Sequence, residues 1–206
     1  MLSSNEILTA LDADVDAAER LTVVPCPDRE AIRQREATSI DLRLGRWFRS
    51  FRQTQTRSVS LVAQAGGGLR DGTAEKSPTK QHFVPFGDHY VLHPGRFVLG
   101  VTLEWLQIPP CFSGYVTGKS SLGRHGLVIE TAAGIHPSFS GCLTLELANV
   151  GEVPLQIYPG MTICQIFLHR TEPGRGGNLG DFSGRRKPIL KSPPFDPIFH
   201  KLREPI

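Results

Sequence analysis

The feature that most constrains this 206-residue chain is a series of short predicted strands, each ended by glycine or proline. Successive side chains of a strand point to opposite faces of a sheet, so alternation of apolar and polar residues predicts one buried face. Strands are expected at 39–45, 142–147 and 162–168, and residues 90–92 and 97–103 are expected to form a hairpin-like pair. Short strands with Gly and Pro turns favour a mainly β sandwich or barrel.

The domain organisation follows from length and composition. A chain of this size is expected to form one domain with a sizeable core, here residues 1–170. Ser3 and Glu6 have the spacing of a capping box, which predicts a short N-terminal helix. The Gly-rich, non-periodic stretch about 64–82 predicts an insertion loop. Residues 171–206 are rich in Gly and Pro and basic, so they are interpreted as a C-terminal arm rather than a second domain.

Charge and cysteine content exclude several classes of protein. The net charge of +3 is too small to indicate a nucleic-acid partner. No apolar run is long enough to span a bilayer, and the N-terminus lacks the pattern of a signal peptide, so no membrane partner and a cytoplasmic location are expected. The four cysteines contain no C-x-x-C pair and indicate neither a disulfide framework nor a structural zinc site.

One polar loop and one strand carry the candidate chemistry. The loop is flanked by glycines and holds two adjacent hydroxyls and two cations, namely Lys119, Ser120, Ser121 and Arg124. Such a loop offers hydroxyls, N–H groups and positive charge to an anion such as a phosphate. Downstream, Thr144 and Glu146 share one face of the predicted strand 142–147. A carboxylate near a phosphate-binding loop indicates acid–base chemistry on a nucleotide.

Two further charged residues lie on the predicted strand 39–45. Asp41 and Arg43 alternate with Ile40, Leu42 and Leu44, so they point away from the apolar face. They are interpreted either as a solvated charged surface or as a contact with a partner or an active site.

Five motifs between residues 37 and 169 resemble the dCTP deaminase family, which shares a superfamily with the trimeric dUTPases. They are SIDLRLG at 39–45, HPG at 93–95, GKSSLGR at 118–124, SGCLTLE at 140–146 and PGM at 159–161. The resemblance implies a distorted, jelly-roll-like β-barrel of the dUTPase type. It also implies a homotrimer with active sites between subunits.

The resemblance further implies hydrolytic deamination of dCTP to dUTP and ammonia. Glu146 is then the general base, while Ser120 and Arg124 position the water or the intermediate. Mg²⁺ enters with the substrate triphosphate, and no zinc is required. The implied substrate-binding residues are Lys119, Ser120, Ser121, Leu122, Gly123, Arg124, His136, Thr144, Leu145, Glu146, Gln165, Phe182 and Arg185.

The residues agree with a carboxylate mechanism. Zinc-dependent deaminases carry H-x-E followed by P-C-x-x-C, and this chain has neither element. A single carboxylate that moves protons contributes roughly 10²–10⁴-fold by general acid–base catalysis.

Two departures from the family pattern leave alternatives open. His136 stands where many relatives have the Asp of an Ile-Asp-Pro-like turn, and residues 181–185 (DFSGR) replace a Lys-Tyr-x-x-Gln tail. Near a triphosphate His136 would tend to become a cation, or it only shapes the turn before Pro137. Either interpretation predicts release of dUTP. The alternatives are a dUTPase, a bifunctional dCTP deaminase/dUTPase, or a non-catalytic nucleotide-binding regulatory trimer.

Overall fold

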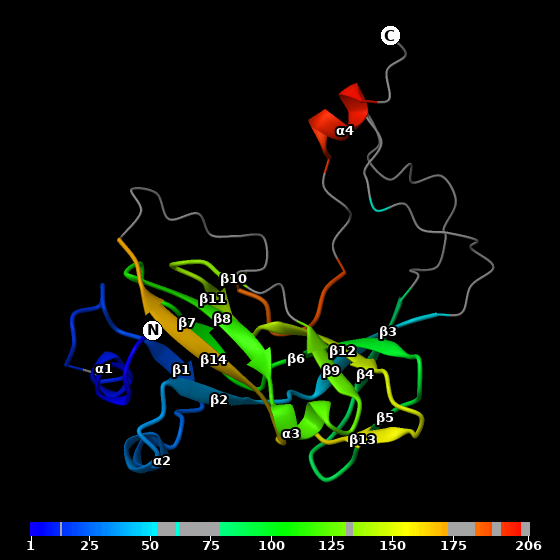
Figure 1. The fold of residues 1–206 in the computed structure, drawn as a ribbon, viewed down its shortest axis with the longest axis horizontal. Coiled ribbons are helices and arrows are strands. Elements are labelled where there is room, and N and C mark those ends of the chain that lie inside the picture. The colour runs from blue at the N-terminus through cyan, green and yellow to red at the C-terminus, as the bar shows by residue number, and fades with distance from the viewer. Residues whose placement is uncertain are drawn as a thin grey trace.

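The computed structural model describes residues 1–12, 14–52, 61, 79–130, 134–172, 184–190 and 195–202. Short antiparallel strands are the main regular structure of the described residues, which confirms the expected mainly β fold. The helices α1 and α2 lie beside one another at one end of the strands, and β3, β4 and β5 lie at the other end (Figure 1). None of the described helices is long and apolar enough to cross a membrane.

Two short helices flank the N-terminal strand. Helix α1 (Ser4–Ala10) begins at the predicted capping box, in which Ser3 and Glu6 bond to each other's backbone N–H groups. Strand β1 (Thr22–Val24) follows, and helix α2 (Arg29–Gln34) comes next. Asp28 caps α2 by accepting a hydrogen bond from the Ala31 N–H at 3.0 Å.

A four-stranded antiparallel sheet contains most of the SIDLRLG motif, and the GKSSLGR motif begins at the end of one of its strands. Its order is β10-β8-β14-β2. The bounds are β10 (Gly134–Ile135), β8 (Phe112–Gly118), β14 (Thr162–Arg170) and β2 (Ser39–Arg43). Ile40 and Leu42 of β2 are buried, while Asp41 and Arg43 are exposed on the other face, as their alternation predicts.

A five-stranded sheet carries the strand with Glu146. Its order is β4-β3-β6-β12-β9, and all pairs are antiparallel. The bounds are β4 (Thr79–Phe83), β3 (Trp47–Phe51), β6 (Phe97–Val101), β12 (Thr144–Asn149) and β9 (Leu127–Glu130). Leu145 and Leu147 are fully buried in the core, so the residues between them face outward.

The expected hairpin of residues 90–92 and 97–103 is wrong. Strand β5 (Tyr90–Leu92) pairs with β13 (Leu155–Ile157), whereas β6 pairs with β3 and β12. The cause is the buried Asn149. Its side-chain amide donates to the Leu92 carbonyl, and its main-chain carbonyl accepts a hydrogen bond from the Gly95 N–H. These bonds hold the connecting turn against the end of β12, so the two strands diverge.

The remaining strands and the arm complete the body. Strand β7 (Trp105–Gln107) lies between β1 and β11 (Ser140–Gly141). Of the predicted insertion loop, residues 79–82 belong to β4, and residues 64–78 lie outside the described part of the chain. The predicted arm contains a short helix, α4 (Pro197–Lys201). Its segment 184–190 packs on the body, where the Gly184 N–H bonds to the Ser140 carbonyl at 2.6 Å.

Gly126 fixes the polar loop to the end of β12. Its φ of +88° is unfavourable for residues with a Cβ, and an added Cβ would lie 2.7 Å from the Gly151 nitrogen. We expect Gly126→Ala to lower the free energy of unfolding by about 2 kcal/mol or more, since a left-handed backbone costs roughly 1–2 kcal/mol before any clash. Urea denaturation measures this loss.

The matched control for this substitution is Gly123→Ala in the same loop. A Cβ at Gly123 meets no atom within 4 Å, and this residue is helical. Its replacement is expected to leave stability unchanged or to raise it by up to about 1 kcal/mol. Equal losses for both variants would contradict the role given to Gly126.

Candidate active site

Three polar side chains from three neighbouring strands or their ends meet at one edge of the four-stranded sheet. Gln165 of β14 pairs with Asp41 of β2 on one side and with Thr117 of β8 on the other. Lys119, just after β8, extends its Nζ to Asp41 Oδ1 at 2.6 Å and to Gln165 Oε1 at 3.3 Å. We call Asp41, Lys119 and Gln165 the Lys119 group.

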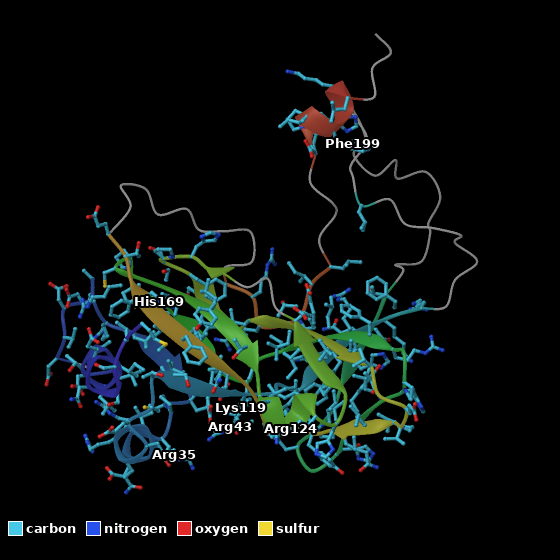
Figure 2. The ribbon with its side chains drawn as sticks, in the orientation of Figure 1. Arg35, Arg43, Lys119, Arg124, His169 and Phe199 are labelled. Carbon is cyan, nitrogen blue, oxygen red and sulfur yellow. The ribbon has the colours of Figure 1, made fainter. Side chains whose placement is uncertain are left out.

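The predicted hydroxyl loop continues directly from this group. It forms a single helical turn, α3 (Ser120–Gly123), with Lys119 at its N-cap. Ser120, Ser121 and Arg124 are exposed, so their hydroxyls and guanidinium can reach a ligand, whereas Leu122 packs partly against the core. Figure 2 shows Arg35, Arg43, Lys119 and Arg124 gathered along one edge of the molecule.

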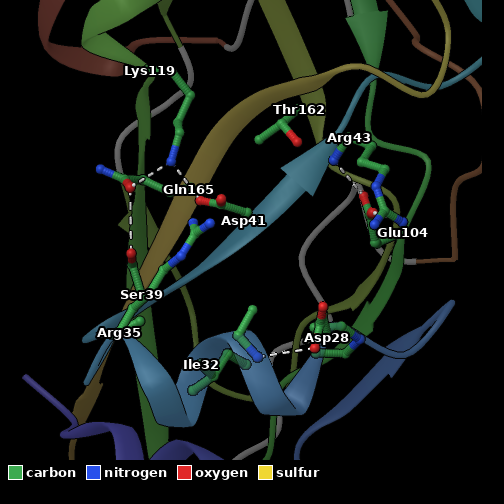
Figure 3. A pocket seen from close by; sticks show the side chains of 13 residues that line it. Asp28, Ile32, Arg35, Ser39, Asp41, Arg43, Glu104, Lys119, Thr162 and Gln165 are labelled. Atoms are coloured by element: carbon green, nitrogen blue, oxygen red, sulfur yellow. Dashed lines mark hydrogen bonds and ion pairs between the residues drawn. The ribbon is translucent and has the colours of Figure 1, made fainter.

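A cavity of about 300 Å³ adjoins the Lys119 group (Figure 3). It lies between α2, β2 and β14, and both Asp41 and Arg43 line it. Their place in a cavity favours a site contact over a merely solvated surface. Glu104, only 3% exposed, also lines the cavity and accepts the Arg43 backbone N–H at 2.8 Å. Burial raises the pKa of the Glu104 carboxyl above its ordinary value, and the Arg43 N–H partly offsets this effect.

Glu146 lies on the outward face of the five-stranded sheet. In the strand register it is opposite Leu99 of β6 and Glu130 of β9, and Leu99 is opposite Arg49 of β3. Directly opposed residues project to the same face of a sheet, so these side chains form one row. Thr144 lies two residues along β12 on this face, which we call the Glu146 face.

Leu145 points the other way. Its side chain is fully buried in the core, so Leu145 offers only its backbone to the Glu146 face.

The C-terminal arm crosses the Glu146 face. The Cys142 N–H donates to the Arg185 carbonyl at 2.8 Å, and Arg49 Nε donates to the Pro188 carbonyl at 3.0 Å. Lys187 Nζ lies 4.0 Å from the centroid of the Trp47 ring. The structure therefore places Arg185 beside the strand segment that leads to Glu146. Phe182 lies outside the described residues.

The environments of Cys142 and His136 are simple. Burial raises the pKa of the Cys142 thiol to about 11, so it stays protonated and is a poor nucleophile near neutral pH. His136 is exposed in the turn after β10, where its carbonyl accepts the Phe139 N–H at 3.3 Å. This position fits both interpretations of His136, as a phosphate contact and as a turn residue.

The Lys119 group and the Glu146 face lie on different sides of the five-stranded sheet. An added Cβ at Gly118, which precedes Lys119, would contact the Ile129 side chain at 3.1 Å, so the end of β8 packs against Ile129. Ile129 is opposite the buried Leu147, so β8 approaches the inner face of the sheet. Glu146 projects from the outer face. In the described part of the chain, no hydrogen bond or ion pair joins Glu146 to Ser120 or Arg124.

Sequence reasoning found Asp41, Arg43, Lys119 and Gln165 but missed Arg35 and Glu104, which also line the cavity. Arg35 belongs to the end of α2, a helix too short to show a clear apolar period, although Asp28 is a typical N-cap. Glu104 follows a predicted strand directly, and only the fold shows that it is buried. Within the described residues, His, Cys, Asp and Glu nowhere form a group of three that could hold a metal ion.

Comparisons with known proteins agree with this architecture. The sequence pattern of the dCTP deaminase-like family matches residues 1–171. The "dCTP deaminase, dUMP-forming" of Mycolicibacterium smegmatis is 39% identical over 179 residues, which cover 84% of this chain and 87% of that protein. The "dCTP deaminase" of Halorubrum lacusprofundi is 36% identical over 200 residues, covering 91% and 93%. The Mycobacterium ulcerans "dCTP deaminase, dUMP-forming" is 40% identical over 185 residues, covering 86% and 90%.

A solved structure shows the same fold. The 2'-deoxycytidine 5'-triphosphate deaminase of Agrobacterium tumefaciens superposes with a TM-score of 0.56 at 21% identity, covering 82% of this chain and 47% of that one. The chain thus spans about half of that solved chain. The fold is that of a nucleotide-deaminase β-barrel, which confirms the distorted barrel expected from the sequence. The matched pattern goes further: the chain belongs to the dCTP deaminase-like family.

Proposed function

We propose that this chain catalyses the hydrolytic deamination of dCTP. The observation that carries the proposal is the state of Glu146, a half-buried carboxylate on a ligand-accessible sheet face. Within the described residues it has no hydrogen-bond or ion-pair partner, so it is available to accept a proton. Membership of the dCTP deaminase-like family and relatives named dCTP deaminases at 36–40% identity support the choice of substrate.

The proposed mechanism needs no metal at the base. Glu146 removes a proton from the water that attacks C4 of cytosine and passes it to ring N3. It then moves the hydroxyl proton of the tetrahedral intermediate to the amino group, so that the C4–N bond breaks, ammonia leaves and C4 becomes a carbonyl. Ser120 and Arg124 position the water and the tetrahedral intermediate. Thr144 and the backbone of Leu145 flank the base.

The phosphates are proposed to bind where the cations and hydroxyls gather. Lys119, Ser121, Gly123 and the loop backbone hold the phosphate chain, and Mg²⁺ arrives bound to the triphosphate. Gln165 supports Lys119 through its 3.3 Å hydrogen bond. Arg185, held beside β12, supplies a further cation from the arm.

The separation of the hydroxyl loop from Glu146 within one chain supports a homotrimer with active sites between copies. In one chain the hydroxyl loop and Glu146 lie on different sides of the five-stranded sheet. Leu127, just after the loop, pairs with Asn149, and Glu146 lies three residues before Asn149 on β12. Three residues of strand span about 10 Å, so Glu146 lies well away from the strand end that adjoins the loop. A second copy can bring its own loop to the Glu146 face.

Glu146→Gln is expected to abolish deamination while nucleotide binding remains. The amide keeps the shape of the side chain but cannot accept the proton, so we expect kcat to fall by at least about 10²-fold. Ammonia release and calorimetric binding of dCTP measure the two effects. The matched control is Glu130→Gln, which removes the opposite carboxylate on the same face and is expected to keep kcat within tenfold.

Two outcomes would contradict this assignment. Turnover by Glu146→Gln within tenfold of wild type would exclude Glu146 as the base. Tightly bound zinc at one ion per chain, required for turnover, would replace the carboxylate mechanism. Wild-type protein that binds dCTP and releases no ammonia would instead favour the regulatory alternative.

Mixed trimers test the proposed interface directly. Ser120→Ala and Glu146→Gln subunits are each expected to be inactive alone. When the two variants are co-expressed at equal levels and assemble at random, three quarters of the trimers contain both. If Ser120 and Glu146 of one site come from different copies, each mixed trimer has one intact site out of three. We expect about a quarter of wild-type activity. Activity no higher than the sum of the two inactive variants would show that both residues act within one chain.

A second candidate product is dUMP. The mycobacterial relatives are named dUMP-forming, which favours a further cleavage of the triphosphate. Attack of water on the α-phosphate needs an anionic base near the phosphates, and position 136 carries histidine. A histidine at this position does not supply a carboxylate to serve as that base.

We therefore expect dCTP to give dUTP and ammonia without pyrophosphate. Separation of the nucleotide products by chromatography, with an assay for pyrophosphate, measures this. His136→Asp is the matched variant, because it supplies a carboxylate at this position. Equal amounts of dUMP and pyrophosphate from the wild-type protein would establish the dUMP-forming reaction and show that His136 does not prevent it.

A further inference from the structure

The cavity beside the Lys119 group contains a cation that the proposed mechanism does not use. Arg35 is the C-cap residue of α2 and lines the cavity together with Lys119 and Arg43. Figure 3 shows Arg35 extending from α2 toward Asp41, Lys119 and Gln165. Its guanidinium makes no hydrogen bond or ion pair with any other described residue.

The carboxylates of the cavity already have partners. Asp41 pairs with Lys119 at 2.6 Å, and Asp28 caps α2 through the Ala31 N–H. Glu104 accepts the Arg43 N–H and lies 4.0 Å from the Arg43 guanidinium. Among the described residues, Arg35 is therefore the one cation lining the cavity whose side chain has no hydrogen-bond or ion-pair partner, so it is available to bind an anion.

Size and position limit what this anion can be. About 300 Å³ is the lower limit for ligand pockets, so the cavity accommodates only part of a nucleotide. Lys119 belongs both to the cavity wall and to the start of the hydroxyl loop. Lys119 thus joins the loop to the cavity, and a phosphate chain bound by the loop has room to extend past Lys119 toward Arg35.

We propose that Arg35 binds the terminal phosphate of the substrate and thereby selects nucleoside triphosphates over diphosphates. A guanidinium suits this role because its planar donors bind two phosphate oxygens at once. The inference rests on the proposed function for the identity of the nucleotide. Arg35 acts in binding, so its loss affects KM rather than kcat.

The test compares Arg35→Gln with Arg33→Gln. Arg33 lies on the same helix, pairs with Glu30 at 2.8 Å and does not line the cavity. Calorimetry measures binding of inorganic triphosphate and of pyrophosphate to each full-length variant, and steady-state assays measure KM and kcat for dCTP. Circular dichroism confirms that both variants fold.

Arg35→Gln is expected to weaken triphosphate binding and to raise KM for dCTP, each by at least about tenfold, because the charged contact with two phosphate oxygens is lost. Pyrophosphate binding and kcat are expected to change less than twofold, and Arg33→Gln should change none of these values more than twofold. Unchanged triphosphate binding, or equal loss for triphosphate and pyrophosphate, would overturn the inference. Arg35-dependent triphosphate binding by a protein that does not deaminate dCTP would overturn the proposed function alone.

Discussion

The two-residue period of β12 decides where this chain can perform chemistry. Leu145 and Leu147 are fully buried, and burial of each contributes roughly 1.5–3 kcal/mol. A shift of one residue in the strand register would place both leucines in solvent and Glu146 in the core. The core therefore fixes the carboxylate on the outer face. The packing of β8 against Ile129 on the inner side then separates Glu146 from the hydroxyl loop.

Sequence patterns predicted the parts of the fold that follow local rules. Alternation identified β2 and the outward position of Asp41, and the capping box identified α1. The same alternation placed Thr144 and Glu146 together on one face. These features depend on neighbouring residues along the chain, so a single sequence contains the information needed to find them.

The features that the sequence did not reveal depend on contacts between distant segments. Tyr90–Leu92 pairs with β13 rather than with β6 because Asn149, more than fifty residues away, holds the intervening turn. Helix α2 is too short for a periodic pattern, so the cavity and Arg35 could not be foreseen. The buried Glu104 finds its hydrogen-bond partner, the backbone N–H of Arg43, only when β2 folds beside it.

The strength of the arm's attachment determines how it can take part in turnover. Lys187 over Trp47 and Arg186 over Trp105 are cation–π contacts worth about 0.5–1 kcal/mol each at exposed sites. The hydrogen bonds donated by Cys142, Arg49 and Gly184 add about 1 kcal/mol each. A sum of a few kcal/mol lies below the stability of a typical domain, so the arm can leave the Glu146 face while the barrel stays folded. Arg185 is therefore carried by a segment that can detach, whereas Lys119 is held beside the sheet by its contacts with Asp41 and Gln165.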